Sequence, residues 1–174
     1  MTLVVLLGGA RAGKSALALD LAAGWNGPVS YIATAEARDE EMAERIERHR
    51  TRRPDSWSTV EEPVALGDAL AVLPADQAAV IDCLTLWVAN VLERGDDHDA
   101  IVAEGEAIAR AAADRRAPVI AVTNEVGLGI VPANELARSY RDLLGTVNRA
   151  FVAQSERAAL VVAGRLLKLD DATW

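Results

Sequence analysis

Short apolar runs alternate with longer amphipathic stretches along this chain, and the alternation predicts strands joined by helices. Continuous apolar runs predict buried strands at 3–7, 28–35, 78–85, 118–126 and 158–164. Apolar residues at helical spacing predict helices at 14–24, 38–53, 64–73, 100–116 and 132–155. Because buried strands joined by helices form βαβ units, we expect an α/β fold with a mostly parallel sheet and helices on both faces.

The length of the chain predicts a single domain over residues 1–174, and its 51% of hydrophobic residues suffices for one core. The formal net charge is -8, whereas a general binder of nucleic acid or membranes needs a broad basic face. We therefore expect neither as a partner. The N-terminus MTLVVLLGGARAGKS lacks a basic leader, and no apolar run reaches the ~18 residues of a membrane span. These features predict a cytoplasmic protein.

The segment GGARAGKS, residues 8–15, follows a predicted strand and opens a predicted helix. It has the form G-x-x-x-x-G-K-[ST], and this context is the one that a phosphate-binding loop requires. The glycines allow backbone amides to curl around phosphate oxygens, and the helix N-terminus adds positive charge. The predicted nucleotide-binding residues here are Gly8, Gly9, Ala10, Arg11, Ala12, Gly13, Lys14 and Ser15. The motif predicts a nucleoside triphosphate site and a three-layer fold of the P-loop NTPase type.

Within this loop, Lys14 is expected to act in catalysis by reaching the β- and γ-phosphates, and Ser15 is expected to bind Mg²⁺. Asp82 follows a buried run and is a candidate to hold the same Mg²⁺ through water and so contribute to the nucleotide site. The alternative is an aspartate that only makes a turn. Cys83, the only cysteine, excludes an intramolecular disulfide and is interpreted as a small buried apolar residue.

Beyond the loop, the chain resembles the bifunctional adenosylcobinamide kinase / adenosylcobinamide-phosphate guanylyltransferase family of cobalamin biosynthesis. The most specific matching segments are RIERHRTRRPDSW and NEVGLGIVP. The departures are Ala12, where the family suggests serine, and residues 93–117, which match nothing in it. The resemblance is carried in order by GGARAGKS (8–15), YIATA (31–35), DEEMAERIERHRTRRPDSWSTVEEP (39–63), DCLTLWVANVL (82–92), TNEVGLGIVPANELARSYRDLLGTVNR (123–149) and LVVAGRLLKL (160–169).

The resemblance implies two reactions. A nucleoside triphosphate, ATP or GTP, phosphorylates the aminopropanol hydroxyl of adenosylcobinamide. GMP is then transferred from GTP to adenosylcobinamide-phosphate through a guanylylated histidine, which aligns with His49. The resemblance also implies an oligomer, with a trimer as the specific form. It carries nucleotide contacts onto Thr34, Ala35, Glu36, Arg50, Thr51, Arg52, Arg53 and Glu61.

The residues around His49 are consistent with this role. Met42, Ile46 and His49 fall at i, i+4 and i+7 on one predicted helical face, beside a face rich in arginine. A neutral imidazole is nucleophilic near pH 7, and arginines offer donors to the oxygens of the reacting phosphate. From the residues alone, a half-buried surface histidine on a solvated helix is the other interpretation.

Other interpretations remain open at this stage. A P-loop kinase for another small alcohol would need no guanylyl transfer, and a nucleotide-dependent switch would transfer nothing. Glu125 could orient a hydroxyl or Mg²⁺, or it could brace its own loop. His98, the only other histidine, is flanked by acidic residues and is interpreted as solvated.

Overall fold

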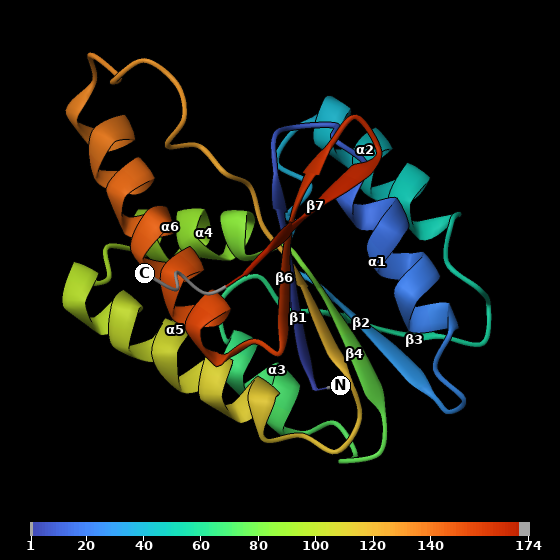
Figure 1. Ribbon diagram of the computed structural model, residues 1–174. Coiled ribbons are helices and arrows are strands. Elements are labelled where there is room, and N and C mark those ends of the chain that lie inside the picture. Colours follow the sequence, from blue (N-terminus) through green and yellow to red (C-terminus); the bar gives the residue numbers. More distant parts are fainter. Residues whose placement is uncertain (1, 171–174) are drawn as a thin grey trace.

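The computed structural model describes residues 2–170 and shows one seven-stranded sheet between two layers of helices (Figure 1). The strand order is β3-β2-β4-β5-β1-β6-β7, and only β7 runs antiparallel to its neighbour. This confirms the predicted fold class. The strands are β1 (Leu3–Gly8), β2 (Val29–Ala33), β3 (Ser58–Glu61), β4 (Ala78–Asp82), β5 (Val119–Val122), β6 (Arg157–Val162) and β7 (Arg165–Leu169). The helices are α1 (Lys14–Ala23), α2 (Glu40–Arg50), α3 (Leu66–Ala71), α4 (Leu84–Arg94), α5 (His98–Ala113) and α6 (Glu135–Gln154).

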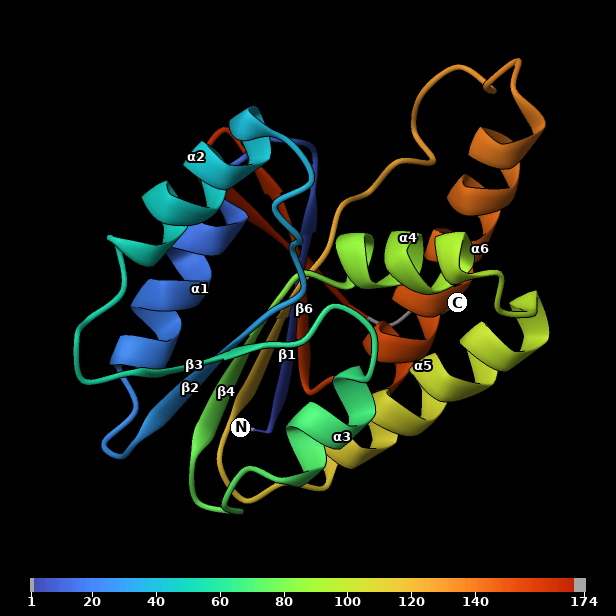
Figure 2. The same ribbon diagram turned by 180° about the vertical axis from the view of Figure 1, so that it is seen from behind.

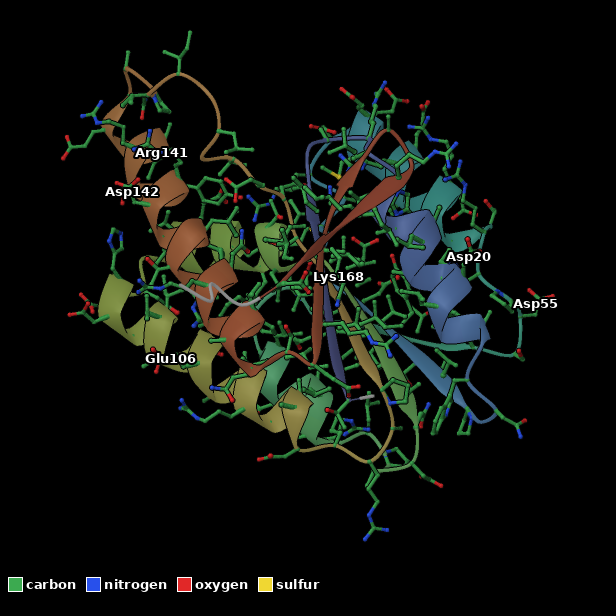
Figure 3. All side chains as sticks on the ribbon, in the orientation of Figure 1. Asp20, Asp55, Glu106, Arg141, Asp142 and Lys168 are labelled. Atoms are coloured by element: carbon green, nitrogen blue, oxygen red, sulfur yellow. The ribbon has the colours of Figure 1, made fainter. Side chains whose placement is uncertain are left out.

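Each face of the sheet packs against its own apolar cluster. The helices α3, α4, α5 and α6 lie on one face, and α1 and α2 lie on the other (Figure 2). Leu3 and Val5 of β1 belong to the cluster that contains Trp87, whereas Val4 packs on the α1 side with Ala18. Because successive strand side chains point to opposite faces and both faces are covered, the run in β1 is apolar without interruption. Exposed charges such as those of Asp20, Glu106 and Asp142 lie on the outer surfaces of the helices (Figure 3).

Four predicted strands extend past their observed carboxyl ends. The strands predicted at 28–35 and 158–164 end two residues early, at Ala33 and Val162. The strand predicted at 78–85 ends at Asp82, and α4 begins at Leu84. No glycine or proline separates β4 from α4 in the sequence. Because both elements are buried and apolar, the pattern of hydrophobic residues did not show where the strand ends and the helix begins. Leu84, Val88 and Val91 lie on the buried side of α4 at helical spacing. The strand predicted at 118–126 similarly ends at residue 122.

Neither edge strand was predicted. β3 has four residues, and Ser58, Thr59 and Glu61 in it are exposed, so it presents no buried apolar run. All five residues of β7 are exposed, and it pairs with β6 as a hairpin. Edge strands are covered on one side only, which weakens the hydrophobic pattern that marks central strands.

Capping side chains set the observed starts of α2 and α5. Asp39 accepts a hydrogen bond from the Met42 amide at 2.7 Å, so α2 begins at Glu40, and it ends at Arg50 instead of continuing to residue 53. Asp97 caps α5 in the same way, and α5 therefore begins at His98. Within residues 2–170, no helix has the length and apolar character that a transmembrane span requires.

A single arginine clamps the loops at the amino-terminal edge of the sheet. The guanidinium of Arg115 donates to the backbone carbonyl oxygens of four residues before β4, at distances from 2.6 to 3.3 Å. These residues are Leu70, Leu73, Pro74 and Gln77. The clamp joins the loop after α5 to the loop after α3, at the end of the sheet opposite the phosphate loop (Figure 1).

Candidate functional site

The carboxyl ends of the central strands form one row of residues. The sheet register pairs Glu61 of β3 with Ala33 of β2, Ala33 with Asp82 of β4, and Asp82 with Val122 of β5. β1 continues the row, because its Leu6 pairs with Val122, and the phosphate loop follows β1 directly. Ligands of open parallel sheets bind at this edge, so the sequence-predicted residues converge where the fold favours a site.

The phosphate loop has backbone conformations that only glycine adopts without strain. Gly13, at the N-cap of α1, has φ +104°. A Cβ atom on Gly8 would lie 2.3 Å from the carbonyl oxygen of Val161. The Nζ atom of the buried Lys14 donates to the carbonyl oxygens of Gly8 at 2.9 Å and Gly9 at 2.7 Å. Burial lowers the pKa of Lys14, although Asp82 partly offsets this effect.

Asp82 is the centre of the polar contacts at this edge. Its Oδ2 atom accepts a hydrogen bond from the Tyr31 hydroxyl at 2.5 Å and lies 3.5 Å from Nδ1 of His49. The Ser15 side chain is also close enough to Asp82 to lower its pKa. Burial alone would raise the pKa of Asp82, but the contacts with His49, Tyr31 and Ser15 hold that pKa below its usual value. Asp82 is therefore a carboxylate at neutral pH.

This carboxylate joins His49 to the phosphate loop. The His49 side chain is 28% exposed, and it faces Asp82, which in turn contacts Ser15 in the first turn of α1. Met42, Ile46 and His49 are the half-buried residues of α2, and the remaining residues of that helix are exposed. The predicted face of α2 is thus correct, and the imidazole ring lies at the carboxyl edge of the sheet, beside Asp82.

The arginines after His49 separate into two groups. Arg50 and Arg52 are exposed, as is Thr51 between them, whose hydroxyl donates to the Arg48 carbonyl at 3.2 Å. Arg53 is half-buried: its Nε donates to the His49 carbonyl at 3.2 Å, and its Nη1 donates to Thr59 Oγ1 at 2.9 Å. Its guanidinium carbon also lies 3.8 Å from the centre of the Tyr31 ring. Arg53 therefore braces the end of α2 against β2 and β3, in addition to its predicted nucleotide contact.

The predicted residues after β2 differ in their contacts. Thr34 is fully buried, and its Oγ1 both donates to the Cys83 carbonyl and accepts from the Cys83 amide, each at 2.7 Å. The hydroxyl of Thr34 thus ties the end of β2 to the end of β4. Ala35 is half-buried, and the exposed Glu36 forms an ion pair with Arg38 at 2.6 Å. Glu61, at the end of β3, is exposed.

Sequence reasoning missed Tyr31 and Asn90 as site residues. Tyr31 is 3% exposed within a strand of small and aliphatic residues. A buried tyrosine hydroxyl needs a hydrogen-bond partner, and this requirement was the available signal. The Asn90 amide nitrogen donates to the carbonyls of Thr34 at 2.8 Å and Pro63 at 3.0 Å, so it positions the loop after β2.

Glu125 and His98 make contacts outside the Asp82 cluster. Glu125 Oε1 accepts from the Gly127 amide at 2.5 Å, which corresponds to the loop-bracing alternative for this residue. The His98 ring lies 3.0 Å from the Ser139 hydroxyl, between α5 and α6, and it is exposed. His98 is therefore remote from the contacts that connect His49 to the loop.

The residues at this edge suit a magnesium ion that is bound partly by protein and partly by nucleotide and water. They do not suit a metal whose ligands all come from the protein. The Ser15 hydroxyl and the ionised Asp82 offer hard oxygen ligands next to each other. The described residues contain no group of three or more histidine, cysteine or acidic side chains that could hold a metal. Mg²⁺ usually takes one or two protein ligands together with phosphate oxygens and water, so the donor set is suitable for it.

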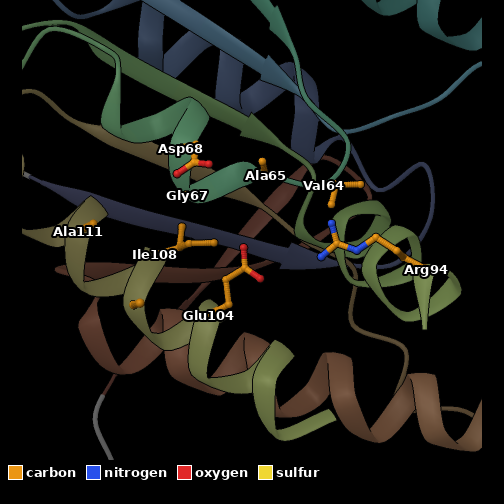
Figure 4. A pocket seen from close by; sticks show the side chains of 9 residues that line it. Val64, Ala65, Gly67, Asp68, Arg94, Glu104, Ile108 and Ala111 are labelled. Carbon is orange, nitrogen blue, oxygen red and sulfur yellow. The ribbon is translucent and has the colours of Figure 1, made fainter. Parts of the chain in front are cut away.

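A separate hollow of about 380 Å³ lies between α3 and α5, near the end of α4. Arg94, Glu104 and Asp68 line it together with Ile108 and Val64 (Figure 4). None of its lining residues belongs to the predicted nucleotide site. The hollow is therefore separate from the predicted nucleotide site.

Comparison with solved structures supports the P-loop-type fold. An ATPase from the type III secretion system of pathogenic bacteria is similar to this chain with a TM-score of 0.55 and 10% sequence identity. The match covers 91% of this chain and 50% of the ATPase chain. At this identity the likeness concerns the fold alone.

Sequence comparison identifies the family. A family model described as cobinamide kinase / cobinamide phosphate guanyltransferase matches residues 4–169. The bifunctional adenosylcobalamin biosynthesis protein CobP of Pseudomonas aeruginosa is 46% identical over 161 residues, which are 92% of each chain. The proteins of the same description named CobU from Escherichia coli K12 and Salmonella typhimurium are 39% and 40% identical, over 96% of this chain and 99% of theirs. The chain therefore belongs to the cobinamide kinase / cobinamide phosphate guanyltransferase family.

Proposed function

We propose that this protein is a bifunctional transferase of cobalamin biosynthesis. It phosphorylates the aminopropanol hydroxyl of adenosylcobinamide and then transfers GMP from GTP to adenosylcobinamide-phosphate, giving adenosylcobinamide-GDP and pyrophosphate. The family match and the three bifunctional relatives support both activities. The observation that carries the proposal is the contact of Asp82 with both Ser15 of the phosphate loop and His49.

In the kinase reaction, the phosphate loop binds the nucleoside triphosphate. The amides of residues 8–15 and the N-terminus of α1 surround the β- and γ-phosphates. Lys14 exchanges its contacts with the Gly8 and Gly9 carbonyls for phosphate oxygens, where its charge stabilises the transferring group. Ser15 and Asp82 would hold Mg²⁺, which neutralises phosphate charge when it is bound.

In the guanylyl transfer, the imidazole of His49 attacks the α-phosphorus of GTP, and pyrophosphate leaves. The phosphate of adenosylcobinamide-phosphate then displaces His49 from the guanylyl group. The covalent intermediate divides one difficult displacement into two easier ones. Arg50, Thr51, Arg52 and Arg53 follow His49 directly, and their donors stabilise charge on the phosphate oxygens.

The remaining predicted contacts concern the nucleoside end of the nucleotide. Thr34, Ala35 and Glu36 follow β2, and Glu61 ends β3, so these residues extend the site along the carboxyl edge away from the phosphate loop. We propose that Ala35, Glu36 and Glu61 contact the nucleoside of GTP, and that the fully buried Thr34 acts by holding the end of β2 in place. A carboxylate such as that of Glu61 can accept hydrogen bonds from a purine base.

We also propose that the protein acts as a homo-oligomer in the cytoplasm, with a trimer as the specific form. Exposed apolar side chains occur on the loop after β5 and on the unpaired edge of the hairpin, and such surfaces favour association. They include Leu128, Ile130, Val131, Leu166 and Leu167. The oligomer would cover part of this surface and leave the remainder to the large corrinoid substrate.

The test uses GTP labelled on its α-phosphate. After incubation and denaturation, we expect the label to stay on the wild-type protein and on His98→Ala, and to be absent from His49→Ala. His49→Ala should retain the phosphorylation of adenosylcobinamide, because the kinase reaction does not use the imidazole. Label that is missing from the wild type, or undiminished in His49→Ala, would contradict the guanylyl-transfer step. Only a phosphoryl-transfer enzyme would then remain.

A further inference from the structure

The contacts of Asp82 determine which nitrogen of His49 carries a proton. An ionised carboxylate only accepts hydrogen bonds, and it attracts the positive end of an N–H dipole that faces it. The Tyr31 hydroxyl donates at 2.5 Å, and Nδ1 of His49 faces the same oxygen at 3.5 Å. A proton on Nδ1 is attracted to this oxygen, whereas a lone pair on Nδ1 is repelled by it, so the contact favours a neutral imidazole with its proton on Nδ1 and its lone pair on Nε2.

We propose that Asp82, held in place by the Tyr31 hydroxyl, fixes His49 in the tautomer protonated on Nδ1, so that Nε2 receives the guanylyl group. This inference rests on the proposed guanylyl transfer and specifies its reacting atom. It also assigns to Tyr31 a positioning role, because its hydroxyl acts on the substrate only through Asp82 and His49.

Contacts through Arg53 and Asp82 fix the position of Tyr31 relative to His49. Arg53 lies over the Tyr31 ring at 3.8 Å, and its Nε donates to the His49 carbonyl at 3.2 Å. The same tyrosine donates to Asp82, whose Oδ2 faces the His49 ring. The backbone and the side chain of His49 are thus both connected to Tyr31, through Arg53 and Asp82 respectively. A cation over the ring also favours the hydroxyl as a donor, because it withdraws electron density from the ring.

The tautomer matters in both halves of the reaction. In the first, the Nε2 lone pair forms a bond to the α-phosphorus, and the bond from this phosphorus to the bridging oxygen breaks. Pyrophosphate leaves with that electron pair, and the imidazole becomes a cation that keeps its Nδ1 proton beside the Asp82 carboxylate. In the second half, a phosphate oxygen of the acceptor attacks the phosphorus. The electron pair of the broken bond returns to Nε2 and restores the neutral ring.

Nitrogen NMR of the imidazole ring tests the tautomer without any substrate. The chain has two histidines, and His98→Gln leaves His49 as the only histidine ring in the spectrum. We expect the ¹⁵N spectrum of this variant at neutral pH to show a protonated Nδ1 and an unprotonated Nε2. A spectrum with the proton on Nε2 would overturn the inference, whatever the enzyme does with GTP.

The position of the GMP label provides an independent test. Alkaline digestion of the labelled protein and comparison with the two phosphohistidine isomers should identify the Nε2 isomer. The Nδ1 isomer would overturn this inference and leave guanylyl transfer intact. Absence of any labelled histidine would overturn the guanylyl transfer itself.

The role of Tyr31 is tested with two matched tyrosine variants. Tyr31→Phe keeps the ring under Arg53 but removes the hydroxyl, and we expect the rate constant for enzyme–GMP formation to fall about ten-fold with little change in the KM for GTP. The His49 spectrum should also lose part of its preference for Nδ1. Tyr140→Phe removes a hydroxyl that donates to the Thr85 carbonyl at 3.0 Å, away from His49, and should leave both measurements unchanged. Wild-type rate and spectrum in Tyr31→Phe would show that Tyr31 has no positioning role.

Discussion

The amide of Gly164 donates a hydrogen bond to the carbonyl oxygen of Ala12 at 2.9 Å, so the β6–β7 turn is attached to the phosphate loop. Gly164 itself has φ +75°, and a Cβ atom on Gly13 would lie 3.4 Å from its Cα. The phosphate loop is therefore supported from two sides, by the first turn of α1 and by the turn of the β6–β7 hairpin. Its shape depends on segments from both ends of the chain.

Gly13→Ala should lower the free energy of unfolding by about 1–2 kcal/mol, because a side chain at φ +104° is strained. It should also weaken nucleotide binding, since the loop must shift to relieve that strain. Urea denaturation and nucleotide titration measure the two effects. Gly145→Ala is the control: this exposed glycine lies inside α6 with open space around it, and alanine should stabilise the protein by about 0.5–1 kcal/mol. Equal effects of the two substitutions would contradict the strain argument.

Lys14→Ala should reduce both the kinase rate and the formation of enzyme–GMP by at least about 100-fold, because one phosphate loop serves both reactions in the proposed function. The matched control is Lys168→Ala, which changes the other lysine of the chain, an exposed residue on β7 (Figure 3). It should leave both rates near those of the wild type. A Lys14→Ala protein that lost only one activity would indicate two separate nucleotide sites.

The thiol of Cys83 should react slowly with disulfide reagents in the native protein. Burial raises the pKa of Cys83 to about 11, and the charge of Asp82 adds to the effect. The reaction rate should therefore rise with pH towards a midpoint near this value, whereas in urea the midpoint should be that of a free thiol, about 8.5. Because the folded pKa is raised, the stabilisation linked to this thiol is complete below about pH 8.5 and is lost as the pH rises towards 11. A native midpoint near 8.5 would contradict this environment.

Glu104→Gln should raise the free energy of unfolding at pH 7. Glu104 lines the hollow between α3 and α5 (Figure 4), and burial raises the pKa of its carboxyl group. Because the pKa of Glu104 is higher in the folded protein than in the unfolded chain, its protonated form stabilises the fold below the unfolded pKa of about 4.3, and this contribution is lost above the folded pKa. The higher free energy of unfolding of Glu104→Gln should therefore vanish near pH 4. Urea denaturation at both pH values measures the change. Glu106→Gln, an exposed change on the same helix that removes only an ion pair with Arg110, should not stabilise the protein at pH 7.

The phosphate loop could be predicted from the sequence because all of its parts are contiguous. One short segment contains a strand, the glycines, Lys14 and Ser15. This order of elements and residues is specific to a phosphate-binding loop. The half-buried face of α2 was also predictable, since helical spacing places Met42, Ile46 and His49 together. The structure confirms where these residues lie. Their chemical roles stay predictions.

The connection among Tyr31, Asp82 and His49 could not be predicted in the same way. These residues come from β2, β4 and α2, and β2 pairs with β4 although β3 lies between them in the sequence. Hydrophobic patterns identify strands but do not give their order in the sheet. The edge strands and the whole of α4 were missed for a related reason, because partial burial or a continuous apolar sequence removes the signal that separates one element from the next.

The Arg115 clamp gives the protein a rigid end that is free of the proposed chemistry. Pro74, Ala75 and Asp76 are exposed there, on a loop whose carbonyls this guanidinium holds in place. A linker attached at Asp76 would let the molecule be fixed to a resin or an electrode with its nucleotide edge turned towards the solution. Immobilised in this orientation, the protein could be supplied first with GTP and then with the phosphorylated acceptor, and the product of each half of the proposed guanylyl transfer could be collected separately.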